Sequence, residues 1–214
     1  MNLPNRLSLM RICLVPFFIA AYFLPFSWGA FVAVGIFIVA AATDFLDGYI
    51  ARKYNLVTDL GKLLDPIADK ILVCAALFCV VATNPLQFIF NAENATWGAK
   101  FSLILLAVGA TVIISRELLI SAVRQIAASK GVVVQANVFG KIKTIVQDVS
   151  LPMLVTCNFV AFKSTDYTSS VVFEVELFWK IWWWASVVLF GVAVVLTILS
   201  GVIYMVQNKK VFTD

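Results

Sequence analysis

Histidine is absent from this sequence, and only 13% of its 214 residues are charged. The missing imidazole excludes His-based general acid–base catalysis, Ser-His nucleophilic sites and His-ligated zinc or haem. The four cysteines, Cys13, Cys74, Cys79 and Cys157, form no Cys-x-x-Cys pair and all lie in apolar segments. We therefore interpret them as buried small hydrophobic residues rather than as metal ligands or disulfide partners.

The few charged residues are separated by long uninterrupted runs of apolar residues. Hydrophobic residues make up 62% of the chain, and its mean hydropathy is +0.98. No charged residue occurs in 12–43, 71–92 or 181–208. About 20 apolar helical residues cross a hydrocarbon core of about 30 Å, so these runs are long enough to span a membrane. A soluble fold would lack the polar surface needed to cover such helices, and we expect an integral membrane protein.

The hydropathy pattern predicts an all-α, polytopic membrane protein with six transmembrane helices. No internal repeat or low-complexity linker divides the chain, so a single membrane domain is expected over residues 1–214. Residues 1–11 are expected to lie along the membrane surface before the chain turns inward. The six expected crossings are 8–24, 28–52, 61–83, 100–129, 135–162 and 176–207.

The distribution of lysine and arginine predicts the orientation, because these residues are enriched in cytoplasmic loops. Six crossings place both termini on one side. The other side would carry only Lys100, Lys163 and Lys180. We therefore expect both termini and the aspartate-rich loop to face the cytoplasm. The residues assigned to that side are Arg6, Arg11, Arg52, Lys53, Lys130, Lys141, Lys143, Lys209 and Lys210.

Four aspartates gather at two neighbouring helix ends. Asp44 and Asp47 are three residues apart, and Asp65 and Asp69 are four apart, so each pair can share a helix face. A carboxylate inside a membrane costs about 2.5–3.5 kcal/mol, and four together need compensating positive charge. Divalent cations with hard oxygen preference, Mg²⁺, Mn²⁺ or Ca²⁺, would supply it. The alternative is a helical hairpin in which nearby lysines neutralise the carboxylates.

Small residues around the aspartates leave room for a ligand. Gly48 and Gly61 allow a ligand or a neighbouring helix to approach the backbone closely, and Ala51 adds little bulk. The adjacent Arg52 has the guanidinium group that commonly binds phosphate. Metal-binding carboxylates beside a phosphate-binding cation indicate phosphoryl-group chemistry at the membrane surface.

In order, these residues read Asp44-x2-Asp47-Gly48-x2-Ala51-Arg52-x8-Gly61-x3-Asp65-x3-Asp69. This pattern resembles the defining motif of the CDP-alcohol phosphotransferases at every fixed position. The resemblance implies a CDP-linked donor whose CMP is displaced by an alcohol. It also implies that the four aspartates hold two Mg²⁺ or Mn²⁺ ions and that Asp69 takes the proton from the attacking hydroxyl. The residues it assigns to CDP binding are Asn5, Asp44, Gly48, Ala51, Arg52 and Gly61.

Three further cations indicate the class of acceptor alcohol. Arg116, Lys141 and Lys143 lie within or beside predicted membrane helices, where buried cations are costly and usually functional. Together they favour a phosphate-bearing alcohol. Two alternatives stay open: the lysines could be ordinary flanking charges, and Arg116 could pair with Glu117 or Asp148. Lys141 and Lys143 are also about 200° apart around a helix, so both need not point inward.

Two segments, residues 2–11 and 140–147, resemble the bacterial phosphatidylglycerophosphate synthases within this family. That resemblance implies CDP-diacylglycerol as donor, sn-glycerol 3-phosphate as acceptor, and a homodimer in the bacterial cytoplasmic membrane. No nucleic-acid partner is expected. Three alternatives are a sibling enzyme with another acceptor such as inositol phosphate, a divalent-cation transporter, and a non-catalytic lipid-binding scaffold.

Overall fold

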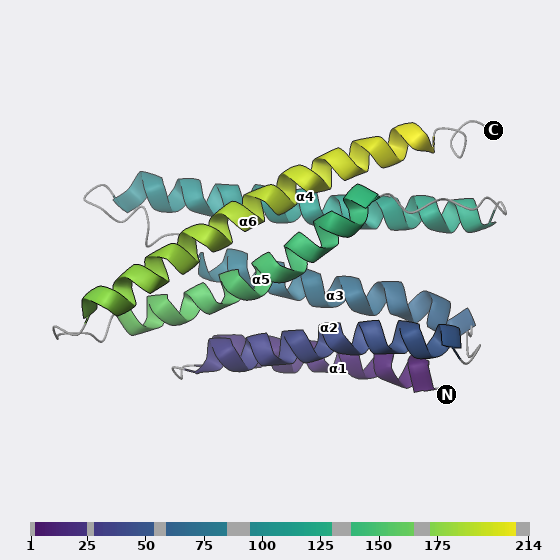
Figure 1. Ribbon diagram of the computed structural model, residues 1–214, viewed down its shortest axis with the longest axis horizontal. Helices are drawn as coiled ribbons and strands as arrows, with labels where there is room; N and C mark the ends of the chain where they lie inside the picture. Colours follow the sequence, from purple (N-terminus) through teal and green to yellow (C-terminus); the bar gives the residue numbers. More distant parts are fainter. Residues whose placement is uncertain are drawn as a thin grey trace. The chain divides into compact units, whose positions relative to one another are not determined.

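The computed structural model describes residues 3–24, 28–53, 59–84, 95–129, 138–164 and 172–208. Within these ranges the chain forms six α-helices and no strand (Figure 1). The all-α prediction is confirmed, and three helices end at the residue that the sequence predicted. The helices are α1 (Leu3–Phe23), α2 (Gly29–Lys53), α3 (Asp59–Thr83), α4 (Ala95–Ser129), α5 (Val138–Ser164) and α6 (Val172–Gln207).

Long apolar helices make this a membrane protein. Among the described residues, three segments are long and apolar enough to cross a bilayer: Arg6–Phe23, Lys100–Ala127 and Phe178–Gln207. Shorter apolar helical stretches cover Gly29–Thr43 and Lys70–Thr83. The number of crossings, six, stays a prediction.

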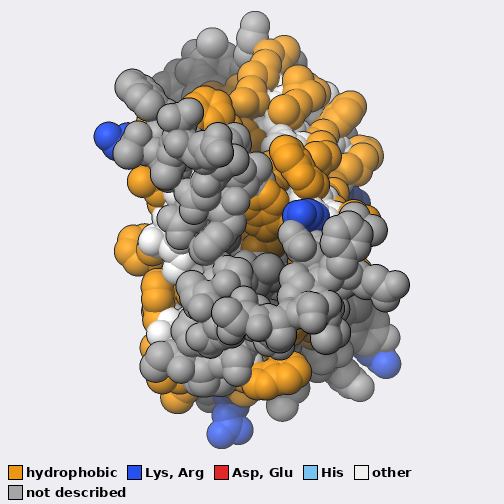
Figure 2. Space-filling view, turned by 90° about the vertical axis from the view of Figure 1, so that its left-hand side faces the viewer, with side chains coloured by type: hydrophobic (Ala, Val, Ile, Leu, Met, Phe, Trp, Pro, Cys, Tyr) orange, Lys and Arg blue, Asp and Glu red, His pale blue; other side chains and the backbone are white. Residues whose placement is uncertain are grey.

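The surface of the described helices is suited to lipid. On the face shown in Figure 2, the described side chains are mostly hydrophobic, and only a few isolated Lys or Arg side chains appear. Phe78 is 69% exposed and Phe17 is 65% exposed. Side chains of this size are normally withdrawn from water, so their outward placement fits a surface that hydrocarbon covers.

The chain divides into two compact units, which are described separately. The first unit combines Met1–Pro85 with Val155–Thr168, and the second combines Leu86–Leu154 with Ser169–Asp214. Helix α5 therefore contributes residues to both units. The sequence-based expectation of one domain over residues 1–214 stays a prediction.

In the first unit, α1 packs against α2 and α3, and α2 also packs against α3. Small residues let α2 approach its neighbours closely, because Ala33 and Ala40 are completely buried on the same face as Phe37. The Phe37 ring lies 6.2 Å from that of Phe18 on α1. At the far end of α1, the Tyr22 hydroxyl and Thr83 Oγ1 form a 2.7 Å hydrogen bond between α1 and α3.

The direction of these three helices alternates along the chain (Figure 1). The carboxyl end of α2 and the amino end of α3 therefore lie at the same end of the first unit, which also holds the amino end of α1. This antiparallel arrangement brings together the two helix ends that carry the aspartates, as the sequence predicted.

The amino-terminal segment continues directly into the first helix. Helix α1 runs without a break from Leu3, so the residues expected to lie along the membrane surface form its first turns. Two polar residues of this segment, Ser8 and Arg11, are completely buried. They lie three positions apart and so share one face of α1.

In the second unit, α4 packs against α6, and the two helices cross obliquely (Figure 1). Gly109 on α4 lies at this crossing. A Cβ atom added there would lie 2.7 Å from Cε1 of Phe190 and 3.1 Å from Cγ2 of Val194, both on α6. A glycine at such a position allows the close approach of membrane helices.

We expect Gly109→Ala to destabilise the protein, by about 1–3 kcal/mol, because the added methyl group overpacks the α4–α6 crossing. Gly35→Ala on α2 is the matched control, since nothing lies within 4 Å of a Cβ built there. Unfolding of both variants in detergent, followed by circular dichroism, measures the difference. Equal stabilities would show that the crossing tolerates a methyl group.

Candidate functional site

The four motif aspartates lie on the two helices that meet at one end of the first unit. Asp44 and Asp47 belong to the carboxyl-terminal part of α2, whereas Asp65 and Asp69 belong to the amino-terminal part of α3. Helix α3 already begins at Asp59, earlier than predicted, so both of its motif aspartates are preceded by at least one helical turn. The helix topology thus brings the two halves of the motif to one end of the unit.

The side chains of these aspartates lie outside the described residues. Their role as metal ligands, and that of Asp69 as the proton acceptor, stay predictions. The same applies to the residues assigned to CDP binding, Asn5, Gly48, Ala51, Arg52 and Gly61.

A second group of polar side chains lies in the second unit, where helices α4, α5 and α6 each contribute to it. Arg116 on α4 donates from Nη1 to Oε1 of Glu117 at 2.9 Å and from Nη2 to Oγ of Ser200 on α6 at 3.1 Å. Lys143 on α5 donates from Nζ to the same Oε1 of Glu117. One carboxylate therefore accepts hydrogen bonds from two cations.

This charged cluster is largely buried. The Lys143 side chain is 1% exposed, that of Arg116 is 15% exposed and that of Glu117 is 25% exposed. A cation in a membrane helix needs a partner of opposite charge, and Glu117 supplies it for both. The alternative considered for Arg116, pairing with Glu117, is therefore present in the structure.

The two lysines of α5 differ in the way that helix geometry predicts. Lys143 is buried in the cluster, whereas Lys141 is exposed. Positions two residues apart fall on opposite sides of a helix, so only one of them can face the cluster. Of these two residues, Lys143 is the one that the structure shows in an ion pair, with Glu117.

Sequence reasoning did not assign a role to two further polar residues, Ser200 on α6 and Gln147 on α5. Gln147 lies one turn beyond Lys143 on the same face of α5 and is 3% exposed. Two buried atoms here, Nε of Arg116 and Oε1 of Gln147, have no hydrogen-bond partner in the part of the chain that the structure describes. The spacing of Lys143 and Gln147 was the sequence signal that both face inward.

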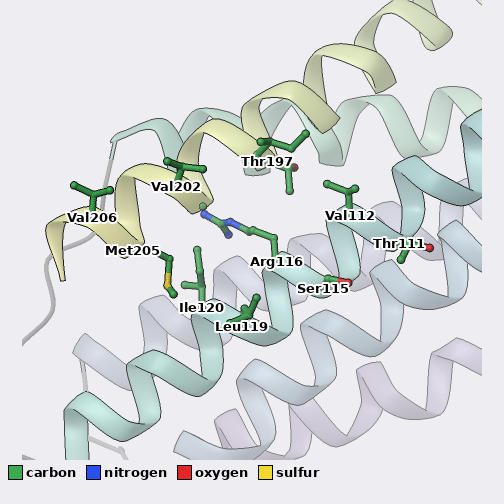
Figure 3. Close-up of a pocket in the computed structure, with 12 residues that line it drawn as sticks. Thr111, Val112, Ser115, Arg116, Leu119, Ile120, Thr197, Val202, Met205 and Val206 are labelled. Carbon is green, nitrogen blue, oxygen red and sulfur yellow. The ribbon is translucent and has the colours of Figure 1, made fainter. Parts of the chain in front are cut away.

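Arg116 also lines a groove between α4 and α6 (Figure 3). The groove has a volume of about 490 Å³, and most of the described residues that line it are apolar, including Leu119, Ile120 and Val202. Arg116 is the one charged residue of the lining, and its guanidinium extends toward α6, where it reaches Ser200. Gly140 and Gly201 lie beside the arginine, since a Cβ atom at either would be in van der Waals contact with it, at 3.4 Å.

Comparison with known proteins identifies the family that these helices represent. Residues 1–199 match the family model of the CDP-alcohol phosphatidyltransferases. The chain belongs to this family. It is therefore an enzyme, a phosphatidyltransferase of phospholipid biosynthesis, and the cation-transporter and scaffold alternatives are set aside. Enzymes of this family generally depend on a divalent metal.

Individual relatives are 37–41% identical to this phosphatidyltransferase over the aligned residues. The CDP-diacylglycerol–glycerol-3-phosphate 3-phosphatidyltransferase of Bacillus subtilis is 41% identical over 73% of this chain and 78% of its own length. The enzyme of the same name from Escherichia coli K12 is 37% identical over 72% of this chain and 76% of its own. A CMP-forming cardiolipin synthase of rice is 41% identical over 72% of this chain and 45% of its own.

The contrast between the two lysines of α5 leads to a labelling prediction. We expect a membrane-permeable acylating reagent to modify Lys141 rapidly and Lys143 slowly, because Lys143 is buried and ion-paired. The reagent is added to the folded protein in detergent, and fragment-ion mass spectrometry then reads each site separately. Labelling after denaturation serves as the control, since both lysines should then react alike. Comparable rates in the folded protein would contradict the buried position of Lys143.

Proposed function

We propose that this phosphatidyltransferase moves the phosphatidyl group of CDP-diacylglycerol to sn-glycerol 3-phosphate, giving phosphatidylglycerol phosphate and CMP. The observation that carries the proposal is the complete eight-residue motif, whose two halves belong to helix ends at the same end of the first unit. The names of the Bacillus and Escherichia relatives support the same donor and acceptor.

The chemistry of the donor set fits a pair of divalent ions. Asp44, Asp47, Asp65 and Asp69 offer oxygen ligands only, and the chain has no histidine to favour zinc. We assign these four residues to two Mg²⁺ or Mn²⁺ ions. When bound, the ions would neutralise the charge that the donor's pyrophosphate group brings.

In the proposed reaction, a hydroxyl oxygen of glycerol 3-phosphate bonds to the phosphorus that carries the diacylglycerol. The bond from that phosphorus to the CMP oxygen breaks, and CMP leaves. Asp69 takes the proton from the hydroxyl. A carboxylate is a weak base, so its contribution comes from its position next to the reacting oxygen. Asn5, Asp44, Gly48, Ala51, Arg52 and Gly61 are assigned to the CDP part of the donor.

The phosphate of the acceptor is assigned to the cations of α4 and α5. Arg116 offers a planar set of N–H donors that suits a phosphate, and the buried Lys143 adds a second positive charge. The exposed Lys141, which the sequence grouped with them, is better suited to attracting the anion from solution.

The cellular setting is part of the proposal. Lysine and arginine asymmetry supports placing both termini and the active site on the cytoplasmic side of a bacterial inner membrane. Glycerol 3-phosphate is water-soluble, so a site that opens to the cytoplasm can receive it while the lipid donor stays in the bilayer. We also propose that the enzyme is a homodimer, a state that crosslinking in membranes would test.

The rice relative favours a second candidate acceptor. Because that protein is named a CMP-forming cardiolipin synthase, an acceptor other than glycerol 3-phosphate is the alternative. Making cardiolipin from CDP-diacylglycerol with release of CMP requires phosphatidylglycerol as the alcohol. A cluster that retains one excess positive charge favours the more highly charged glycerol 3-phosphate.

We expect the purified protein to release CMP from CDP-diacylglycerol only when glycerol 3-phosphate is present, and to stop when the divalent metal is chelated. The assay compares glycerol 3-phosphate with inositol phosphate, phosphatidylglycerol, inositol, serine and no acceptor. Restored activity on adding back Mg²⁺ or Mn²⁺ controls for damage by the chelator. Release with another alcohol in place of glycerol 3-phosphate would overturn the acceptor assignment.

Asp69→Asn should lower turnover by at least about a hundredfold, since general-base contributions are commonly of that size, while binding of CDP-diacylglycerol persists. Asp59→Asn is the matched control because Asp59 lies on the same helix and is not a fixed position of the motif. CMP release and equilibrium binding of radiolabelled CDP-diacylglycerol are measured for both. Turnover at the wild-type rate in the folded Asp69 variant would refute the proposed role of Asp69.

A further inference from the structure

Glu117 binds both cations of the cluster, Arg116 and Lys143. Its Oε1 accepts hydrogen bonds from Nη1 of Arg116 and from Nζ of Lys143, which approach from two different helices. An acceptor phosphate assigned to the same two cations would compete for these donors. The carboxylate and the phosphate are both oxygen anions, and they would repel each other at such short range.

We propose that Glu117 is a built-in competitor for the acceptor phosphate. It holds Arg116 and Lys143 while the acceptor site is empty, and it releases at least one of them when phosphate binds. The inference rests on the proposed function, because it takes the phosphate of the acceptor as the ligand of this cluster. Glu117 is thus a positioning residue that acts through its two cationic partners.

The charge balance of the cluster supports this exchange. Among the three ion-paired side chains, two cations and one carboxylate leave one net positive charge. Without Glu117 the two cations would repel each other in a poorly solvated environment, so the empty site needs an internal anion. The excess charge that remains is still available to attract a phosphate. Asp148, a further carboxylate that attracts Lys143, is exposed at the surface of α5.

The hydrogen-bonding capacity of Arg116 also supports an additional ligand. Arg116 has five N–H donors, and its Nε is buried without an acceptor in the part of the chain that is described. Buried polar atoms in folded proteins normally have partners, so this donor is suited to a further acceptor. A phosphate offers more acceptor oxygens than the single Oε1 atom that the two cations now share.

The test is equilibrium binding of glycerol 3-phosphate and of inorganic phosphate to the full chain in detergent, measured by isothermal titration calorimetry. Glu117→Gln removes the competing charge and keeps a similar shape. We expect its Kd for either anion to fall by roughly tenfold, because the like-charge repulsion is gone. We also expect phosphate to raise its melting temperature more than it raises that of the wild type.

Glu117→Asp is the matched control because it keeps the charge and shortens the side chain by one methylene group. Its Kd should stay close to that of the wild type. If Glu117→Gln binds phosphate no more tightly than wild type, or if both variants lose affinity equally, Glu117 only shapes the cluster and the inference is wrong.

A measurement on the unmodified protein covers the case in which Glu117→Gln does not fold. Infrared difference spectra on adding inorganic phosphate should show a shifted glutamate carboxylate band, which Glu117→Asp would move and so identify. An unchanged band despite bound phosphate would overturn the inference. These experiments require no turnover. The two hypotheses can therefore fail separately. If this enzyme uses a different alcohol, the CMP assay with glycerol 3-phosphate fails, whereas the binding experiments still test the exchange at Glu117.

Discussion

The free-energy cost of placing charge in hydrocarbon constrains every polar feature of this protein. Only 13% of the residues are charged, and the long helices carry large hydrophobic side chains on their outer surfaces. A charged group that remains inside such a bundle must have a partner of opposite sign. The cluster of Arg116, Glu117 and Lys143 follows this rule, because one carboxylate serves two cations from different helices. For the motif aspartates, the same rule supports the assignment to divalent metal ions.

The two polar regions offer different groups, carboxylates in one and cations in the other, and this division suits the proposed reaction. The end of the first unit carries four acids in helices α2 and α3, whereas the cluster in the second unit has an excess of positive charge. A transfer between two phosphate-bearing substrates needs separate compensation for each of them. Metal ions on the acids would serve the pyrophosphate of the donor, and the cations would serve the phosphate of the acceptor. The acids would thus act on the donor through bound metal ions, whereas the cations would act on the acceptor directly.

Much of the fold could be predicted because the bilayer imposes long apolar segments. The ends of α3, α4 and α6 coincide with the predicted ones, since polar residues directly follow the hydrophobic runs, joined by proline after α3 and glycine after α4. The beginning of α1 was harder to predict. Arg6 and Arg11 suggest a surface segment by composition, and that expectation stays a prediction; Arg11 and Ser8 are completely buried on one face of a continuous helix. Tertiary packing, which hydropathy does not encode, decides their environment.

The candidate site was predictable where local spacing determines it and less so where helices must meet. The 200° separation of Lys141 and Lys143 correctly indicated that the two would differ, but only packing shows that Lys143 is the buried one. Ser200 lies 84 residues from Arg116, and no local pattern could reveal that contact. Glu117 was recognised as a possible partner of Arg116 alone. Its simultaneous bond to Lys143 changes the interpretation, because an anion shared by two cations resembles the arrangement that a bound phosphate would adopt.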